Sequence, residues 1–236
     1  MNELSSAARR PIFSGKVGAT KFVVGSALML LVIAFTVLVV RRRAEAVKEP
    51  LPFISRMDPF SLVDQRGKAF GLTDLDGKIW VADFIFTNCQ AACPMLTTRM
   101  RALQKHVEER EQSLGTKLPI RFVSFSVDPE VDTPEKLAAY ATKWGVDQER
   151  WSFLTGPLDE VNRAVVRGLK IHFEKGATDD PGKSLTRDTK SAFDVMHGEH
   201  FVIVDGQRRI RGYFQTDPSG MTELQAALAS LIAETN

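Results

Sequence analysis

One apolar run constrains the fold of this chain more than any other segment. Residues 79–86 are aliphatic or aromatic throughout, except for a single charged side chain, Asp83. Such a run suits a strand that is buried on both faces, because a strand with one solvated face alternates apolar and polar residues. We therefore expect this strand to lie inside a sheet that is covered on both sides.

The segments after this strand alternate between helical and extended patterns. Apolar residues recur at helical spacing from residue 94 and again over 134–144, and a strand-like run, 120–127, separates the two helices. Strands that alternate with helices indicate a parallel or mixed sheet with helices on both faces. The other elements that we predict are a hairpin of 60–63 and 69–72, a strand at 151–154, a helix at 158–169, a polar surface loop at 174–190, a second hairpin of 201–204 and 210–214, and a terminal helix at 221–233.

The N-terminal part has a different composition. Residues 22–40 contain no charged side chain, and as a helix they would span about 28 Å, close to the thickness of a bilayer core. A cleaved signal peptide is the alternative, but its apolar core usually has about 7 to 15 residues. Basic residues flank the span on both sides, so the positive-inside rule gives no orientation. We predict a short cytoplasmic tail (1–21), a transmembrane anchor (22–40), a linker (41–52) and one globular domain (53–236).

The charge balance excludes one class of partner. The formal net charge is only +2, and several of the basic residues flank the apolar N-terminal segment. The globular part is therefore close to neutral and has no basic stripe that could follow a nucleic-acid backbone. We expect no nucleic-acid partner, while membrane, metal and protein partners remain possible.

The two cysteines of the chain lie four positions apart and are followed by a proline. Proline is well tolerated only in the first turn of a helix, so a helix should begin just before Cys93 and leave Cys89 in the loop that follows the buried strand. The positive end of a helix lowers the pKa of a nearby thiol and so favours thiolate. Thiolate binds soft metals and attacks disulfides, which makes this pair the candidate site.

Two thiolates and one imidazole would suit copper, because sulfur favours Cu(I) and nitrogen helps to hold Cu(II). A closed zinc site usually needs four ligands. Of the four histidines, His106 falls on the predicted first helix and His172 beside the polar loop, where solvent exposure explains them. His197 and His200 immediately precede the strand at 201–204 and are better candidates. Spacing alone does not separate these two.

Three motifs resemble the Sco/SenC family of thioredoxin-like copper proteins. Residues 84–94 read Phe-Ile-Phe-Thr-Asn-Cys-Gln-Ala-Ala-Cys-Pro, residues 126–134 contain Asp-Pro-Glu-Val-Asp-Thr-Pro, and residues 196–205 contain His-Gly-Glu-His-Phe before an apolar run. The residues between the cysteines depart from the family, which often has proline or an acidic residue there. In the family the ligand histidine stands four residues before the first large apolar residue of the strand, which here is Phe201.

The resemblance therefore implies a thioredoxin-like fold and a copper ion held by Cys89, Cys93 and His197. It also implies a metallochaperone that delivers copper to a copper centre of a cytochrome c oxidase subunit, with its domain in the periplasm or an equivalent extracytoplasmic space. A thiol-disulfide reductase that uses the same cysteines without metal is the alternative. A peroxidase fits less well, because the loop carries two cysteines. Asp128 and Asp132 could support the site, but we favour a helix start for the segment around Asp132.

Overall fold

The computed structural model describes residues 29–38, 51–90, 92–171 and 200–234. Contacts divide the chain into two compact units, 1–49 and 50–236. In the first unit, residues 29–38 are helical and their side chains are exposed. Within the described ranges, no helix is both long enough and apolar enough to cross a membrane. The remainder of the predicted span 22–40 lies outside those ranges, so the transmembrane anchor stays a prediction.

The described residues of the second unit form one mixed sheet of eight strands, in the order β1-β8-β7-β4-β5-β6-β2-β3. The predicted strand at 79–86 is β4, which lies in the interior of the sheet, parallel to β5 on one side and antiparallel to β7 on the other. The bounds of the strands are Ser55–Arg56 (β1), Ser61–Asp64 (β2), Ala69–Gly71 (β3), Ile79–Ile85 (β4), Ile120–Ser126 (β5), Trp151–Thr155 (β6), His200–Val204 (β7) and Arg209–Gln215 (β8).

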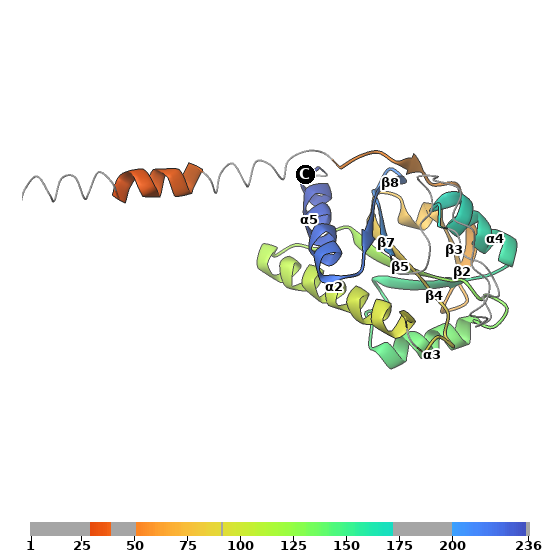
Figure 1. Cartoon of the computed structure of the whole chain (residues 1–236). Coiled ribbons are helices and arrows are strands. Elements are labelled where there is room, and N and C mark those ends of the chain that lie inside the picture. Colours follow the sequence, from red (N-terminus) through yellow and green to blue (C-terminus); the bar gives the residue numbers. More distant parts are fainter. Residues whose placement is uncertain (1–28, 39–50, 91, 172–199, 235–236) are drawn as a thin grey trace, which may run out of the picture. The chain divides into compact units, whose positions relative to one another are not determined.

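Helices cover both faces of this sheet (Figure 1). Ile79, Val81 and Ile85 pack in one apolar cluster with side chains of α2 (Ala92–Leu114), α3 (Pro134–Trp144) and α5 (Pro218–Glu234). The alternate residues Trp80, Ala82 and Phe84 belong to a second cluster. That cluster includes α4 (Leu158–Asn162), the 3-10 turn Leu72–Leu75 and the π-helical segment Arg163–Gly168. Both faces of β4 are therefore buried, as its composition predicted.

The predicted helix at 134–144 is confirmed, and its ends show why it forms there. The Thr133 hydroxyl accepts a hydrogen bond from the amide of Lys136 at 3.4 Å, and Pro134 occupies the first turn. Gly145 ends the helix in the left-handed region, at φ 58°. Both predicted hairpins also form, as β2–β3 and β7–β8.

Two elements differ from the prediction. The helix expected over 158–169 is α-helical only to Asn162 and then widens into the π-helical segment, where Gly168 packs closely on Met57. A Cβ on Gly168 would lie 2.9 Å from the Met57 methyl carbon and 3.2 Å from the Arg163 carbonyl oxygen, so a larger residue would require the Met57 side chain to shift. The short strand β1 was not predicted at all.

An extended segment before the first predicted hairpin joins the sheet through β1, which pairs with β8. The amide of Ile54 donates to the Ile210 carbonyl at 3.0 Å. The buried Arg211 guanidinium donates to the carbonyl oxygens of Leu51 and Pro52, and forms ion pairs with Asp205 and Glu234. Contacts between the start of the described segment 51–90 and the rest of the domain therefore begin at Leu51.

Candidate metal centre

Cys89 and Cys93 lie where β4 passes into α2, at the carboxyl end of the central strand. The amide of Cys89 donates to the Phe86 carbonyl at 3.2 Å, which closes a tight turn after the strand. Cys93 is the second residue of α2, so the predicted helix start is confirmed and Cys89 lies in the loop before it. Cys89 is partly exposed, whereas Cys93 is 3% exposed. Both thiols therefore pack against the same apolar cluster, but only Cys89 is accessible to solvent in part.

The two cysteines are in direct contact through backbone and sulfur. The amide of Cys93 donates a hydrogen bond to Sγ of Cys89 at 3.3 Å. Amides of the first turn have no acceptor within their own helix, and this sulfur satisfies one of them. The same contact places the Cys89 sulfur at the positive end of the α2 dipole, where negative charge is stabilised. Neither cysteine forms a disulfide in this structure.

Cys93 corrects one expectation from the sequence. The pKa of the Cys93 thiol is raised to about 12, mainly by burial; the Phe86 backbone lowers this pKa, and the hydrogen bond and charge of Cys89 contribute to raising it. The prediction that the helix end lowers the thiol pKa is therefore wrong for Cys93, because desolvation of the buried sulfur outweighs the dipole. Cys93 is protonated at neutral pH when no metal is bound.

The histidines are placed unequally. His106 is exposed on α2, as predicted. His200 is the first residue of β7, which runs antiparallel to β4 with Ala82 opposite Val202, so His200 lies at the same end of the sheet as Cys89. Its Nδ1 is buried without a hydrogen-bond partner.

His172 and His197 lie outside the described residues, and His197 as a ligand stays a prediction. Within the described ranges, no group of three His, Cys, Asp or Glu residues could hold a metal ion.

A carboxyl group that the sequence suggested as part of a helix start instead contacts the cysteine loop. Asp132 is completely buried and accepts hydrogen bonds from the amide and hydroxyl of Thr87, and from the hydroxyl of Ser126 at 2.6 Å. Thr133, not Asp132, caps α3. The sequence motif named this aspartate as a candidate, but nothing in it indicated which loop the side chain would reach.

A second buried carboxyl group lies on β4 itself. Asp83 alternates with Ile79, Val81 and Ile85, so it points to the sheet face that α2 covers. The Ser124 hydroxyl donates to its Oδ1, the Trp151 indole donates to Ser124, and Oδ2 has no hydrogen-bond partner. Burial raises the pKa of Asp83 to about 7, against the lowering effect of the Ser124 hydrogen bond. Its charge also contributes to the raised pKa of Cys93. The lone charge in an apolar run was the sequence signal for this group.

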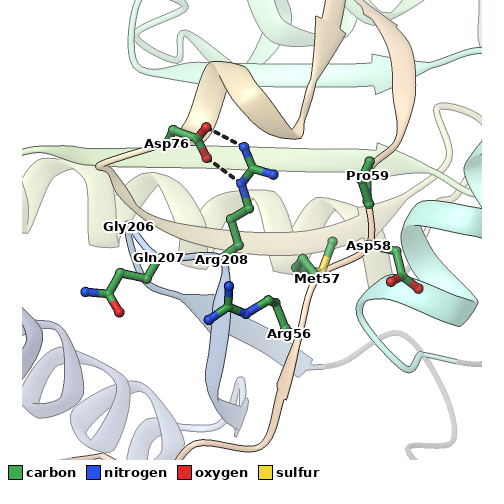
Figure 2. Close-up of a pocket in the computed structure, with 8 residues that line it drawn as sticks. All are labelled: Arg56, Met57, Asp58, Pro59, Asp76, Gly206, Gln207 and Arg208. Carbon is green, nitrogen blue, oxygen red and sulfur yellow. Dashed lines mark hydrogen bonds and ion pairs between the residues drawn. The ribbon is translucent and has the colours of Figure 1, made fainter.

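A surface hollow lies at the opposite end of the sheet from the cysteines. Val204, at the end of β7, pairs with Trp80 near the start of β4, and the hollow is lined by the turn that follows. Figure 2 shows Arg208 of this turn pointing toward Asp76, with which it forms a bidentate ion pair. The lining contains neither cysteine nor histidine, so this hollow plays no part in the candidate centre.

Comparisons with known proteins agree with this geometry. The family model SCO1/SenC matches residues 52–233. The SCO1 protein homolog of Bacillus subtilis is 35% identical over 137 residues, which are 58% of this chain and 67% of that protein. The structure of BsSco, described as a member of the Sco family of cytochrome c oxidase assembly proteins, has a TM-score of 0.62 at 27% identity and covers 78% of this chain and 98% of its own.

The fold extends to more distant structures. Yeast Sco1 with copper bound has a TM-score of 0.55 at 22% identity, over 75% of this chain and 90% of its own. At that identity the likeness concerns the fold alone, a thioredoxin-like mixed sheet with helices on both faces. Because the family model spans most of the sequence, the chain belongs to the SCO1/SenC family.

Proposed function

We propose that this protein binds one copper ion through Cys89, Cys93 and His197 and delivers it to a copper centre of a cytochrome c oxidase subunit. The observation that carries this proposal is the 3.3 Å contact between the Cys93 amide and the Cys89 sulfur, which places two thiol ligands at one helix end. Proteins of this family are metallochaperones rather than enzymes, and some solved Sco structures contain copper. Soft sulfur ligands with one imidazole are suited to both copper oxidation states.

The candidate site has one buried sulfur and one partly exposed sulfur, and this difference supports a role in copper transfer. Cys93 is 3% exposed and is held in the first turn of α2, so it can retain the ion. Cys89 is partly exposed in the preceding loop, where a thiolate of a partner can approach the metal. Ligand exchange between two proteins needs one accessible ligand position, and Cys89 provides it. Transfer then proceeds without a covalent change in the chaperone.

We further propose that residues 22–40 anchor the protein in a membrane, with the domain on the periplasmic or equivalent extracytoplasmic side. The uncharged length of this segment supports the anchor. Delivery to a membrane-bound oxidase also requires a chaperone near the membrane surface. Reporter fusions at both ends of the full chain, together with protease accessibility in spheroplasts, would test this topology. A domain that becomes accessible only after the spheroplasts are lysed would contradict it.

The metal proposal is tested by copper titration of the reduced full-length protein in detergent. We expect one copper ion per chain and a sulfur-to-copper charge-transfer band with Cu(II). Cys89→Ser and Cys93→Ser should abolish stoichiometric binding, whereas His106→Ala, on the exposed face of α2, should leave it unchanged. Full binding by either cysteine variant would contradict the site. Loaded protein should then transfer its copper to a copper-free cytochrome c oxidase subunit.

A thiol-disulfide reductase is the second candidate, and the unequal exposure of the two cysteines fits this function as well. A partly exposed thiol just before a helix N-terminus, followed by a buried one, matches an attacking and a resolving pair. The discriminating measurement is disulfide exchange with a partner peptide in metal-free buffer. Fast exchange that persists in His197→Ala would favour the reductase. Slow exchange together with stoichiometric copper binding would favour the chaperone.

A further inference from the structure

The loop that carries Cys89 is attached to a distant part of the chain by one carboxyl group. Thr87, two residues before Cys89, donates its amide hydrogen to both oxygens of Asp132, at 3.2 and 3.1 Å, and its hydroxyl to Oδ1 at 2.5 Å. Asp132 is 0% exposed. The described residues thus place a fully buried acceptor directly under the loop of the candidate metal centre.

Asp132 is itself held firmly on the neighbouring strand. The Ser126 hydroxyl donates to its other oxygen at 2.6 Å, and Ser126 ends β5, opposite Ile85 at the end of β4. The amide of Asp132 donates to the Asp128 carbonyl at 3.0 Å, within a tight turn that follows β5. Because the turn is short and its backbone is bonded, the carboxyl group has a single position relative to the end of β4.

The connection from Asp132 to the sulfur is short and continuous. Thr87 lies inside the turn that the hydrogen bond from the Cys89 amide to the Phe86 carbonyl closes. That turn presents the Cys89 sulfur to the amide of Cys93. A shift of Thr87 would therefore move the sulfur away from the helix end, although neither cysteine touches Asp132.

We propose that Asp132 is a positioning residue that holds the Thr87–Cys89 loop so that the Cys89 sulfur remains beside Cys93. The inference deepens the proposed function, since it concerns the same two cysteines, but it applies to their metal-free chemistry as well. Two sulfur atoms that are fixed close together have a higher effective concentration toward each other than two sulfur atoms of which one lies on a mobile loop. Asp132 therefore favours any state in which both sulfurs are joined, by a metal ion or by a disulfide.

A carboxyl group suits this position better than any amide. Each of its two oxygens accepts from two donors: Oδ1 from the Thr87 amide and hydroxyl, and Oδ2 from the Thr87 amide and the Ser126 hydroxyl. An asparagine has the same shape, but its NH₂ group donates and cannot accept from these groups. Asp132→Asn therefore loses at least one of the two contacts of the Thr87 amide, because that amide can only donate, and it leaves no cavity.

The test uses the dithiol–disulfide equilibrium of the full-length protein with dithiothreitol in metal-free buffer. Oxidised dithiothreitol accepts two electrons and two protons from the two thiols, which then form the Cys89–Cys93 disulfide. Asp132→Asn replaces one of the two acceptor oxygens by a donor, and Thr87→Val removes only the hydroxyl contact on the loop side. Thr142→Val is the matched control, because it makes the same exchange on α3, where the hydroxyl donates to the Ala138 carbonyl. Urea unfolding of each variant measures its stability separately.

We expect Asp132→Asn and Thr87→Val to shift the equilibrium toward the dithiol by at least about threefold, and Thr142→Val by less than that. An unchanged equilibrium in Thr87→Val, with only a lower urea midpoint, would overturn the proposal. So would a shift in Thr142→Val as large as that in Thr87→Val. Should Asp132→Asn fail to fold, Thr87→Val and Thr142→Val decide the matter alone. Absence of copper binding in the wild type would refute the proposed function and leave this equilibrium test intact.

Discussion

Asp83 accepts a hydrogen bond from the Ser124 hydroxyl although both side chains are completely buried in the sheet. Among the described residues, the second oxygen of Asp83 has no hydrogen-bond partner, and no cationic side chain donates to this carboxyl group. A carboxyl group in this setting favours its neutral form, because burial penalises the charge. This pair therefore makes the stability of the domain depend on pH near neutrality.

Relative to the wild type, Asp83→Asn should raise the unfolding free energy of the reduced, metal-free protein by more at pH 8 than at pH 5. The folded-state pKa of Asp83, about 7, lies above its unfolded value of 3.8, so the folded protein binds the extra proton and the wild type loses stability as pH rises toward 7. Asparagine cannot ionise and avoids this loss, which amounts to roughly 2–3 kcal/mol between these pH values. Urea unfolding at both pH values measures the difference.

Ser124→Ala provides the control for this effect. The Ser124 hydrogen bond lowers the folded-state pKa of Asp83. Without this bond, the decline in unfolding free energy should therefore continue to a higher pH than in the wild type. A wild-type unfolding free energy that rises between pH 5 and pH 7, relative to Asp83→Asn, would contradict the assignment.

Iodoacetamide at pH 8 should label Cys89 well before Cys93. Cys89 is partly exposed, whereas Cys93 is buried and its pKa is raised to about 12, so almost no Cys93 thiolate is present at this pH. Peptide mass spectrometry after short labelling gives the ratio. Cys89→Ser should react only as fast as the protein unfolds, and equal labelling of both cysteines in the wild type would contradict the unequal environments.

His197→Ala should weaken Cu(II) binding by at least about tenfold, since an imidazole helps the thiolates to hold Cu(II). His200→Ala tests the alternative, because His200 lies at the cysteine end of the sheet and its Nδ1 has no hydrogen-bond partner. Copper competition titrations with a chelator of known affinity measure both. Loss of binding in His200→Ala with unchanged binding in His197→Ala would show that His200 is the ligand.

Arg211→Met should destabilise the domain by about 1–3 kcal/mol, because it removes the buried ion pair with Asp205 and the donor to the carbonyl groups of Leu51 and Pro52, while Asp205 keeps its ion pair with Arg209. Arg208→Met is the matched control. Arg208 pairs with Asp76 at the surface, where an ion pair contributes less than about 1 kcal/mol (Figure 2). Thermal or urea unfolding of both variants compares them, and equal losses would contradict the role given to Arg211.

Strong local patterns were sufficient to predict most of the elements. The run 79–86 indicated a strand buried on two faces, and the Thr133-Pro134 start located α3, because each depends on residues within a few positions. The helix start before Cys93 followed from one proline in the same way. Family resemblance then supplied the architecture and the metal.

Features that depend on distant contacts could not be predicted. Strand β1 forms only because β8 offers an edge to residues Ser55–Arg56, and the π-helical turn accompanies the close packing of Gly168 on Met57. The raised pKa of Cys93 depends on its burial, whereas the sequence revealed only its place at a helix end. The contact between Asp132 and Thr87 joins two motifs that the sequence presents separately.

That contact also orders events during synthesis of the chain. Thr87 and Asp132 are 45 residues apart, and both cysteines are translated before Asp132. A nascent chain that ends after α2 carries both sulfurs but neither β5 nor the carboxyl group that supports their loop. The arrangement of the two sulfurs is therefore completed only when β5 has paired with β4, so folding precedes the capacity to capture a ligand.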